Sequence, residues 1–214
     1  MKIDIGCGSR KHPDFFGIDR LPFPDVDLVS DINNPLPFPD DSVEFIMASR
    51  SLPYVDDLFA VMTELYRICA HKAVICILAP YAHSFIHMSN PRFKQQFDEH
   101  TPRYFTAQFF QPSHGPLCPA NTHYPEDIPP FDFRLLRMEL FYDPAYASPL
   151  YEREELEMLQ TIQPNVVQEI MYHLVAIKNP IALEELEQMS NLDYPEPEAV
   201  SELRKPFSDA DFFS

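Results

Sequence analysis

Short runs rich in apolar residues, separated by turns rich in proline and aspartate, fill the first fifty residues. Four of these runs predict β-strands, at residues 2–5, 15–21, 26–32 and 42–49. The turn signals between them are the stretches HPD, PFPD and NNPLPFPDD. This part of the chain therefore predicts four strands joined by stiff, irregular connections.

The hydrophobic period changes over residues 55–70, where apolar side chains recur at three- and four-residue steps. This spacing predicts an amphipathic helix, with Asp56 or Asp57 as its N-cap. The nearly continuous apolar run that follows, residues 72–80, predicts a strand buried on both faces. Strands of this kind joined through a helix favour an α/β fold on a parallel sheet.

The second half of the chain is less regular. Residues 90–130 contain several prolines and aromatic residues without a steady period, which indicates long ordered loops and short helices. Residues 131–143 and 166–178 predict an antiparallel closing pair of strands, although the second segment also fits a helix. The charged stretch between them, residues 151–160, has helical character.

An acidic segment begins at Ile181, with nine acidic and two basic residues among its 34. The sequence therefore predicts one domain over residues 1–180 and a tail over residues 181–214 that is largely disordered or docks as a segment. Residues 182–189 predict one short helix in the tail. The last phenylalanines of the tail could dock on a partner protein, although a solvated tail is the preferred interpretation. These residues are Phe207, Phe212 and Phe213.

The composition narrows the range of partners and compartments. A net charge of −17 repels phosphate backbones and anionic lipid, so we expect neither nucleic acid nor a membrane surface as partner. No apolar run approaches the roughly 20 residues of a membrane span. We recognise no signal peptide, which predicts a cytoplasmic protein. The four cysteines form no Cys-x-x-Cys pair, so we expect neither a disulfide framework nor a bound metal.

Three of the four glycines, Gly6, Gly8 and Gly17, lie within the first seventeen residues. Residues 4–8, DIGCG, close the first predicted strand and are typical of a short nucleotide-binding turn, in which glycine lets the backbone approach a ligand. Lys11 stands where a dinucleotide-binding fingerprint requires a third glycine. The sequence therefore disfavours a nicotinamide oxidoreductase.

Small or acidic residues also close the next three predicted strands. Asp19 ends the second, Asp31 and Ile32 end the third, and Ser49 ends the fourth. A carboxylate offers two acceptor oxygens to the hydroxyls of a ribose, and an acceptor beside an apolar side chain suits an adenine. Each aspartate alone is also explained as a turn or cap residue. Their repeated placement predicts a ligand site along one edge of the sheet.

Together these segments resemble the class I S-adenosylmethionine-dependent methyltransferases, and most closely the small bacterial type whose first motif reads Asp-x-Gly-Cys-Gly-x-x-Lys. The likeness covers residues 2–81 well, and residues 98–106 and 172–178 more faintly. It implies a Rossmann-like α/β fold with helices flanking a mostly parallel seven-stranded sheet whose last strand is antiparallel. It also implies that S-adenosylmethionine binds across the first four strand ends.

The resemblance further implies roles for individual residues. Gly6 and Gly8 approach the methionine part of the cofactor, and Asp4 lies beneath its amino group. Asp19 holds the ribose and Asp31 the adenine. The complete predicted cofactor set, in which Ser49 lies close to the sulfonium, is Asp4, Ile5, Gly6, Cys7, Gly8, Asp19, Arg20, Asp31, Ile32 and Ser49.

The sequence also departs from the family pattern. Only eleven positions separate Gly8 from Asp19, with Pro13 among them, so a loop is predicted in place of a first helix. Residues 51–54, SLPY, replace a frequent Leu-Glu-His run, and residues 70–73, AHKA, replace a Pro-Gly-Gly turn. We expect the leading helix that commonly covers the site to be missing. These departures bear more on catalysis than on cofactor binding.

Methyl transfer from a sulfonium is an in-line displacement, so positioning matters most and a general base is needed only for some acceptors. His100, His83 and Tyr81 are candidate catalytic residues on the acceptor side, with His100 preferred. His83 and His87 have metal-ligand spacing, but no third ligand accompanies them. The predicted function is methyl transfer to a small molecule or a peptide segment. The alternative is a catalytically degenerate methyltransferase-like protein that acts in binding or interaction.

Overall fold

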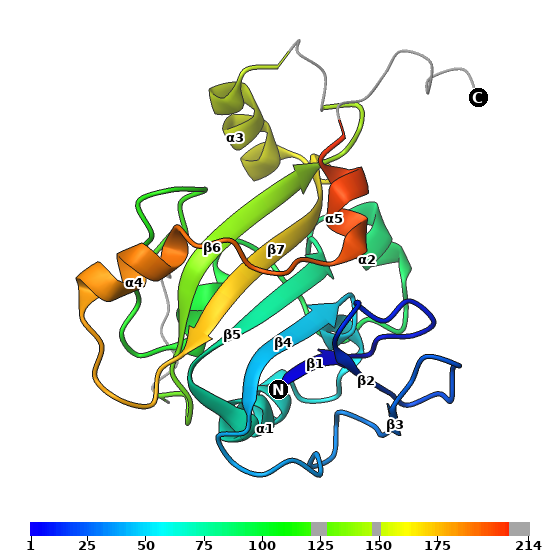
Figure 1. Cartoon of the computed structure of the whole chain (residues 1–214). Coiled ribbons are helices and arrows are strands. Elements are labelled where there is room, and N and C mark those ends of the chain that lie inside the picture. The colour runs from blue at the N-terminus through cyan, green and yellow to red at the C-terminus, as the bar shows by residue number, and fades with distance from the viewer. Residues whose placement is uncertain (121–127, 147–150, 206–214) are drawn as a thin grey trace.

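A seven-stranded sheet forms the centre of the computed structural model, which describes residues 1–120, 128–146 and 151–205 (Figure 1). The strands run in the order β3-β2-β1-β4-β5-β7-β6, and β1 to β5 are parallel. β7 is antiparallel to both of its neighbours. The predicted fold class is therefore confirmed. The strands are β1 (Lys2–Ile5), β2 (Phe16–Asp19), β3 (Leu28–Val29), β4 (Val43–Ser49), β5 (Cys69–Pro80), β6 (Phe133–Tyr142) and β7 (Val167–Ala176).

Alternating side chains of the central strands fill two hydrophobic layers. On β4 and β5, Ile46 and Ile75 face the first layer, whereas Met47 and Cys76 face the second. The apolar run predicted as a doubly buried strand is buried throughout residues 73–80, and β5 extends it back to Cys69. The closing antiparallel pair is also confirmed, because residues 167–176 form a strand and not a helix.

Helix α1 (Leu58–Ile68) covers the first face of the sheet. The Asp57 carboxylate accepts a hydrogen bond from the Ala60 N–H at 3.0 Å, so this residue is the N-cap. The apolar stripe of α1 packs into the first layer beside the segment that carries the short 3-10 helix η2 (Thr101–Phe105). The remaining short helices nearby are the 3-10 helix η1 (Leu52–Tyr54) and α2 (Phe85–Ser89).

The described part of the acidic segment, residues 181–205, packs on the second face. It contains α4 (Leu183–Ser190) and α5 (Glu198–Leu203), and its Leu186 and Val200 are buried in the second layer. The sequence predicts disorder or docking here, and the structure shows docking on the chain's own sheet. Widely spaced apolar residues such as Leu186 and Val200 explain why this segment is ordered on the sheet despite its acidic composition. The terminal phenylalanines lie outside the described residues, and the boundary at residue 180 stays a prediction.

Helix α3 (Arg153–Ile162) follows β6 and buries none of its residues. All four cysteines are buried and free. Within residues 1–120, 128–146 and 151–205, no helix is long and apolar enough to cross a membrane.

Candidate functional site

The connection between β1 and β2 is a glycine turn followed by a loop. The chain turns directly after β1 at Gly6 and Gly8, whose φ angles are 65° and 58°. The Gly6 and Cys7 N–H groups both donate to the Ile18 carbonyl, at 2.7 and 3.2 Å, which holds the turn against β2. Residues 6–15, all described, form turns and no helix, as the sequence predicts. The connection therefore places no helix at the end of β1.

The three early glycines are required for different reasons. A Cβ on Gly6 would lie 2.4 Å from the Ser51 Cβ, whereas one on Gly8 would meet no atom within 4 Å. Gly8 therefore opens onto free space. Gly17 lies within β2, where a Cβ would lie 2.6 Å from the Lys11 Cδ and 2.9 Å from the Cys7 Sγ. Close packing of the loop on β2 explains Gly17.

Two aspartates at strand ends hold this turn together. The Asp19 carboxylate accepts the Gly8 N–H and the Leu21 N–H on separate oxygens, both at 2.9 Å. The Asp4 carboxylate is 3% exposed and accepts the His12 N–H at 2.8 Å. Burial raises the pKa of Asp4 to about 6, against the lowering effect of that hydrogen bond and of nearby His12 and Lys11.

A cavity of about 340 Å³, here called the Asp19 cavity, lies at the carboxyl ends of β2, β3 and β4. Asp31 lies after β3, and its Oδ1 accepts hydrogen bonds from the backbone and side-chain amides of Asn33. Five of the predicted cofactor residues line this cavity: Gly6, Asp19, Arg20, Asp31 and Ile32. It thus combines the two strand ends whose aspartates, Asp19 and Asp31, the resemblance assigns to the ribose and the adenine.

A second cavity of about 540 Å³, here called the Asp4 cavity, lies at the end of β1. Gly6 and Arg50 line both cavities, so the two are adjoining parts of one elongated site. The Asp4 cavity is lined by the predicted residues Asp4, Gly6, Cys7, Gly8 and Ser49. Among the predicted set, Ile5 lines neither cavity. Its side chain is fully buried in the first layer.

Arg50 and Ser51 are site residues that the sequence analysis misses. Arg50 has a φ of 55°, and its guanidinium donates from Nε and Nη2 to the buried carboxylate of Glu169 on β7, at 2.5 and 2.7 Å. The Ser51 hydroxyl is buried and has no hydrogen-bond partner among the described residues. Their position directly after Ser49 is the signal that could have found them.

The candidate catalytic residues lie elsewhere. The Tyr81 hydroxyl donates to Glu99 at 2.6 Å, and burial together with that carboxylate raises the Tyr81 pKa far above its ordinary value. Tyr81 therefore keeps its proton and can orient a partner but not accept a proton. The His100 N–H donates to Asp98 at 2.9 Å within a turn. In the described structure, neither the Asp19 cavity nor the Asp4 cavity is lined by Tyr81, His83 or His100.

The spacing of His83 and His87 does not place them on one helical face. His83 precedes Ser84, the N-cap of α2, and only His87 lies within the helix. The His87 ring stacks on Phe93 with centroids 5.5 Å apart, and burial lowers its pKa. A packing role therefore accounts for His87.

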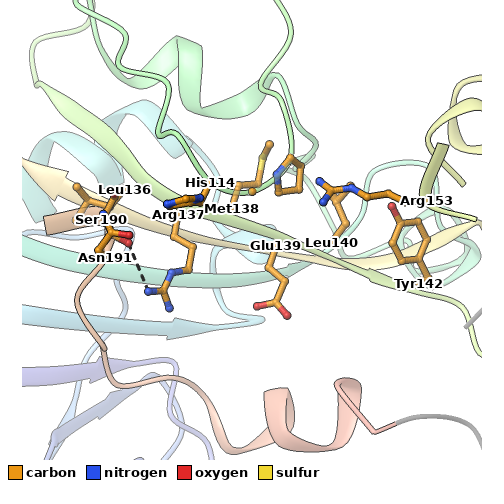
Figure 2. Close-up of a pocket in the computed structure, with 12 residues that line it drawn as sticks. His114, Leu136, Arg137, Met138, Glu139, Leu140, Tyr142, Arg153, Ser190 and Asn191 are labelled. Atoms are coloured by element: carbon orange, nitrogen blue, oxygen red, sulfur yellow. Dashed lines mark hydrogen bonds between the residues drawn. The ribbon is translucent and has the colours of Figure 1, made fainter. Parts of the chain in front are cut away.

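A third cavity of about 520 Å³ lies along β6 at the far edge of the sheet (Figure 2). Two strands, β5 and β7, separate β6 from β4, and no predicted site residue lines this cavity. The Arg137 guanidinium already donates to the backbone oxygens of Ser190 and Leu192, at 3.5 and 2.8 Å. This cavity is separate from the elongated site.

Comparison with known proteins adds a family match. Residues 17–77 match the model of a family described as a methyltransferase domain. This segment runs from β2 into β5 and includes Asp19, Asp31 and Ser49. No curated protein matches the sequence significantly.

Solved structures of similar fold include an SAM-dependent methyltransferase from Archaeoglobus fulgidus, with 18% identity and a TM-score of 0.53 over 81% of this chain and 85% of that one. The cyclase SpnF is 11% identical, with a TM-score of 0.50 over 83% of this chain and 74% of that one. A possible histamine N-methyltransferase from Thermotoga maritima is 14% identical, with a TM-score of 0.48 over 83% of this chain and 82% of that one. The first two of these structures show a shared fold, and the reaction has to be argued from the site.

Proposed function

The chain resembles the class I S-adenosylmethionine-dependent methyltransferases in its fold and in its match to the family model, and on that premise we propose that it is such an enzyme. The adenosine half of S-adenosylmethionine occupies the Asp19 cavity and the methionine half occupies the Asp4 cavity. One observation carries the proposal. Residues predicted from separate strand ends line two adjoining cavities at one edge of the sheet.

The lining residues fit the chemical groups of this cofactor. Each Asp19 oxygen accepts one backbone N–H and keeps acceptor capacity for a ribose hydroxyl. Ser51, whose hydroxyl has no hydrogen-bond partner within the described part of the chain, lines the same cavity. The open face of Gly8 lets a ligand approach the backbone. Acidic and basic side chains, Asp4 and Arg10 among them, both line the Asp4 cavity and suit a zwitterionic amino acid.

S-adenosylmethionine, when bound, supplies a methyl group already activated by a sulfonium. The chain's own task is therefore to orient the cofactor and to hold the acceptor in line. Arg50 lies where the two cavities meet, and Glu169 fixes its guanidinium with two hydrogen bonds. We assign Arg50 a positioning role at this junction. A guanidinium held in this way has a defined orientation and a largely compensated charge.

The proposed acceptor is a small molecule or a peptide segment. A net charge of −17 disfavours nucleic acid, and four free cysteines suit a reducing compartment such as the cytoplasm. On the acceptor side, the Tyr81–Glu99 pair follows β5 and offers a fixed hydrogen-bonding group. A screen of cell extract with labelled S-adenosylmethionine identifies the acceptor. Persistent absence of transfer by a protein that binds the cofactor would favour the degenerate binding protein.

Calorimetry with S-adenosylmethionine and S-adenosylhomocysteine tests cofactor binding. We expect dissociation constants in the micromolar range, or about −8 kcal/mol. Asp19→Asn removes a charged acceptor and should weaken both ligands at least roughly tenfold.

The matched control is Asp57→Asn, since asparagine also caps helices and Asp57 lines neither cavity. Equal binding by Asp19→Asn and the wild type would overturn the ribose assignment. No binding heat from folded wild-type protein would overturn the proposed function.

A further inference from the structure

The segment between α4 and α5, residues 191–197, crosses the second face of the sheet. Figure 1 shows it running from α4 over β6, β7 and β5 toward the end of β4, where α5 begins. Pro195 and Pro197 lie within it and restrict its backbone to extended conformations. Residues 191–199 are here called the C-terminal strap.

Specific contacts fix the strap on the sheet. The Tyr194 ring stacks on the buried His173 ring of β7 with centroids 5.4 Å apart, and the Tyr194 hydroxyl donates to the Met189 carbonyl at 2.8 Å. Val200, directly after the strap, is 1% exposed. Arg137 of β6 donates to the Leu192 carbonyl at 2.8 Å. The strap therefore has a defined path.

Ion pairs then anchor the end of the strap. Arg204 forms two hydrogen bonds to Glu196, at 2.5 and 2.9 Å, and two more to Glu139, at 2.9 and 2.5 Å. Figure 2 shows the Glu139 side chain extending from β6 toward α5. These bonds tie the far edge of the sheet to the strap, and they neutralise Glu196.

The anchored end of the strap forms one side of the Asp4 cavity. Residues 196–199 line this cavity together with the glycine turn after β1. The turn and the loop that follows it contain no helix in residues 6–15, which are all described. The strap thus supplies one wall of the methionine half of the site, and residues 6–8 and 10–13 of the β1–β2 connection supply another.

One carboxylate of this wall remains available for a ligand. Glu198 is exposed, lines the Asp4 cavity and forms no ion pair among residues 1–120, 128–146 and 151–205. We propose that Glu198 holds the ammonium group of the cofactor's amino-acid part, and that the strap determines selectivity for ligands carrying that part. This inference rests on the proposed function.

Two ligands separate the contribution of Glu198 from the rest of the site. S-adenosylhomocysteine carries the amino-acid part, whereas 5′-methylthioadenosine has the same adenosine and thioether without it. Glu198→Gln should weaken S-adenosylhomocysteine roughly tenfold in calorimetry, as expected for one charge-assisted contact. Binding of 5′-methylthioadenosine should be unchanged.

Glu202→Gln is the matched control, because Glu202 lies on α5, pairs with Lys205 and does not line the cavity. It should leave both affinities unchanged. Thermal unfolding of each variant verifies that the protein is folded.

Outcomes separate this inference from the proposed function. If the wild type binds S-adenosylhomocysteine and Glu198→Gln binds it equally well, the role of Glu198 is wrong while the cofactor assignment stands. If Glu198→Gln weakens both ligands alike, the strap supports the fold and does not select the amino-acid part. If folded wild-type protein binds neither ligand, the proposed function itself fails.

Discussion

Two glycines two residues apart have different tasks, although both have positive φ. Gly6 is needed for the fold because Ser51 packs against its α-carbon, whereas Gly8 faces open space at the Asp4 cavity. Glycine is therefore required at position 6 by packing, whereas at position 8 it leaves room for a ligand to approach the backbone.

The two glycines should respond differently to alanine. Gly8→Ala costs the left-handed backbone penalty of about 1–2 kcal/mol. Gly6→Ala adds a clash with Ser51, so we expect a loss of about 3 kcal/mol or more in the free energy of unfolding. Denaturant titration measures both. A Gly6→Ala, Ser51→Gly double variant should recover part of the loss, and equal losses for the two single variants would contradict this assignment.

On the proposed cofactor assignment, Asp4 should make cofactor binding depend on proton release. Burial raises its pKa to about 6, so near pH 6 about half of the molecules carry this proton. A cationic ligand group beside Asp4 favours the ionised form, so binding at pH 6 should release a proton. At pH 8 the carboxyl is already ionised and no release is expected from it.

Calorimetry with S-adenosylmethionine in two buffers of different ionisation enthalpy measures this release. The apparent enthalpies should differ between the buffers at pH 6 and converge at pH 8. Asp4→Asn should abolish the buffer dependence at pH 6. A buffer dependence that persists in this variant would assign the proton to another group.

At the level of the elements, the reversed direction of β7 connects the two halves of the sheet. Its register pairs Glu169 with Pro80, so the amino end of β7 lies at the edge where β4 and β5 end. Glu169 can therefore reach Arg50, 119 positions earlier in the chain. Four positions further along β7, His173 faces the strap and stacks on Tyr194.

His173 should make stability depend on pH. Burial lowers its pKa from 6.5 to about 4; Glu196 opposes this shift, while Arg137 and Arg204 add to it. The unfolded chain takes up a proton at pH values where the native state does not. This stabilisation is therefore complete above pH 6.5 and is lost as the pH falls from 6.5 toward 4, by about 3 kcal/mol in total.

Unfolding free energies of the wild type and His173→Leu, measured from pH 7.5 to pH 4, isolate this contribution from other titrating groups. The wild type should lose about 3 kcal/mol more than the variant over that range. Parallel pH profiles would show that the His173 ring can take up a proton in the folded protein.

For the whole molecule, the sequence was most informative where local pattern and packing agree. The stripe of α1, the doubly buried β5 and the end residues of the first four strands are local signals, and their positions followed from periodicity and turn chemistry. Arg50 was not predictable in this way, because its role depends on Glu169 across the sheet. The burial of Val200 likewise was not predictable, because it depends on residues of the second face that are distant in the sequence. The acidic composition of residues 181–205 does not indicate that this segment packs on the sheet.

The Asp4 cavity is lined by residues from both ends of the described chain, the turn after β1 and the strap. Bringing such distant segments together closes a long loop of the chain, and the entropic cost of that closure slows this step of folding. On the ribosome, residues 4–8 are made well before residues 196–199. A nascent chain can therefore assemble the Asp19 cavity before the Asp4 cavity, so the selectivity proposed for the strap requires residues 196–199 to have been made.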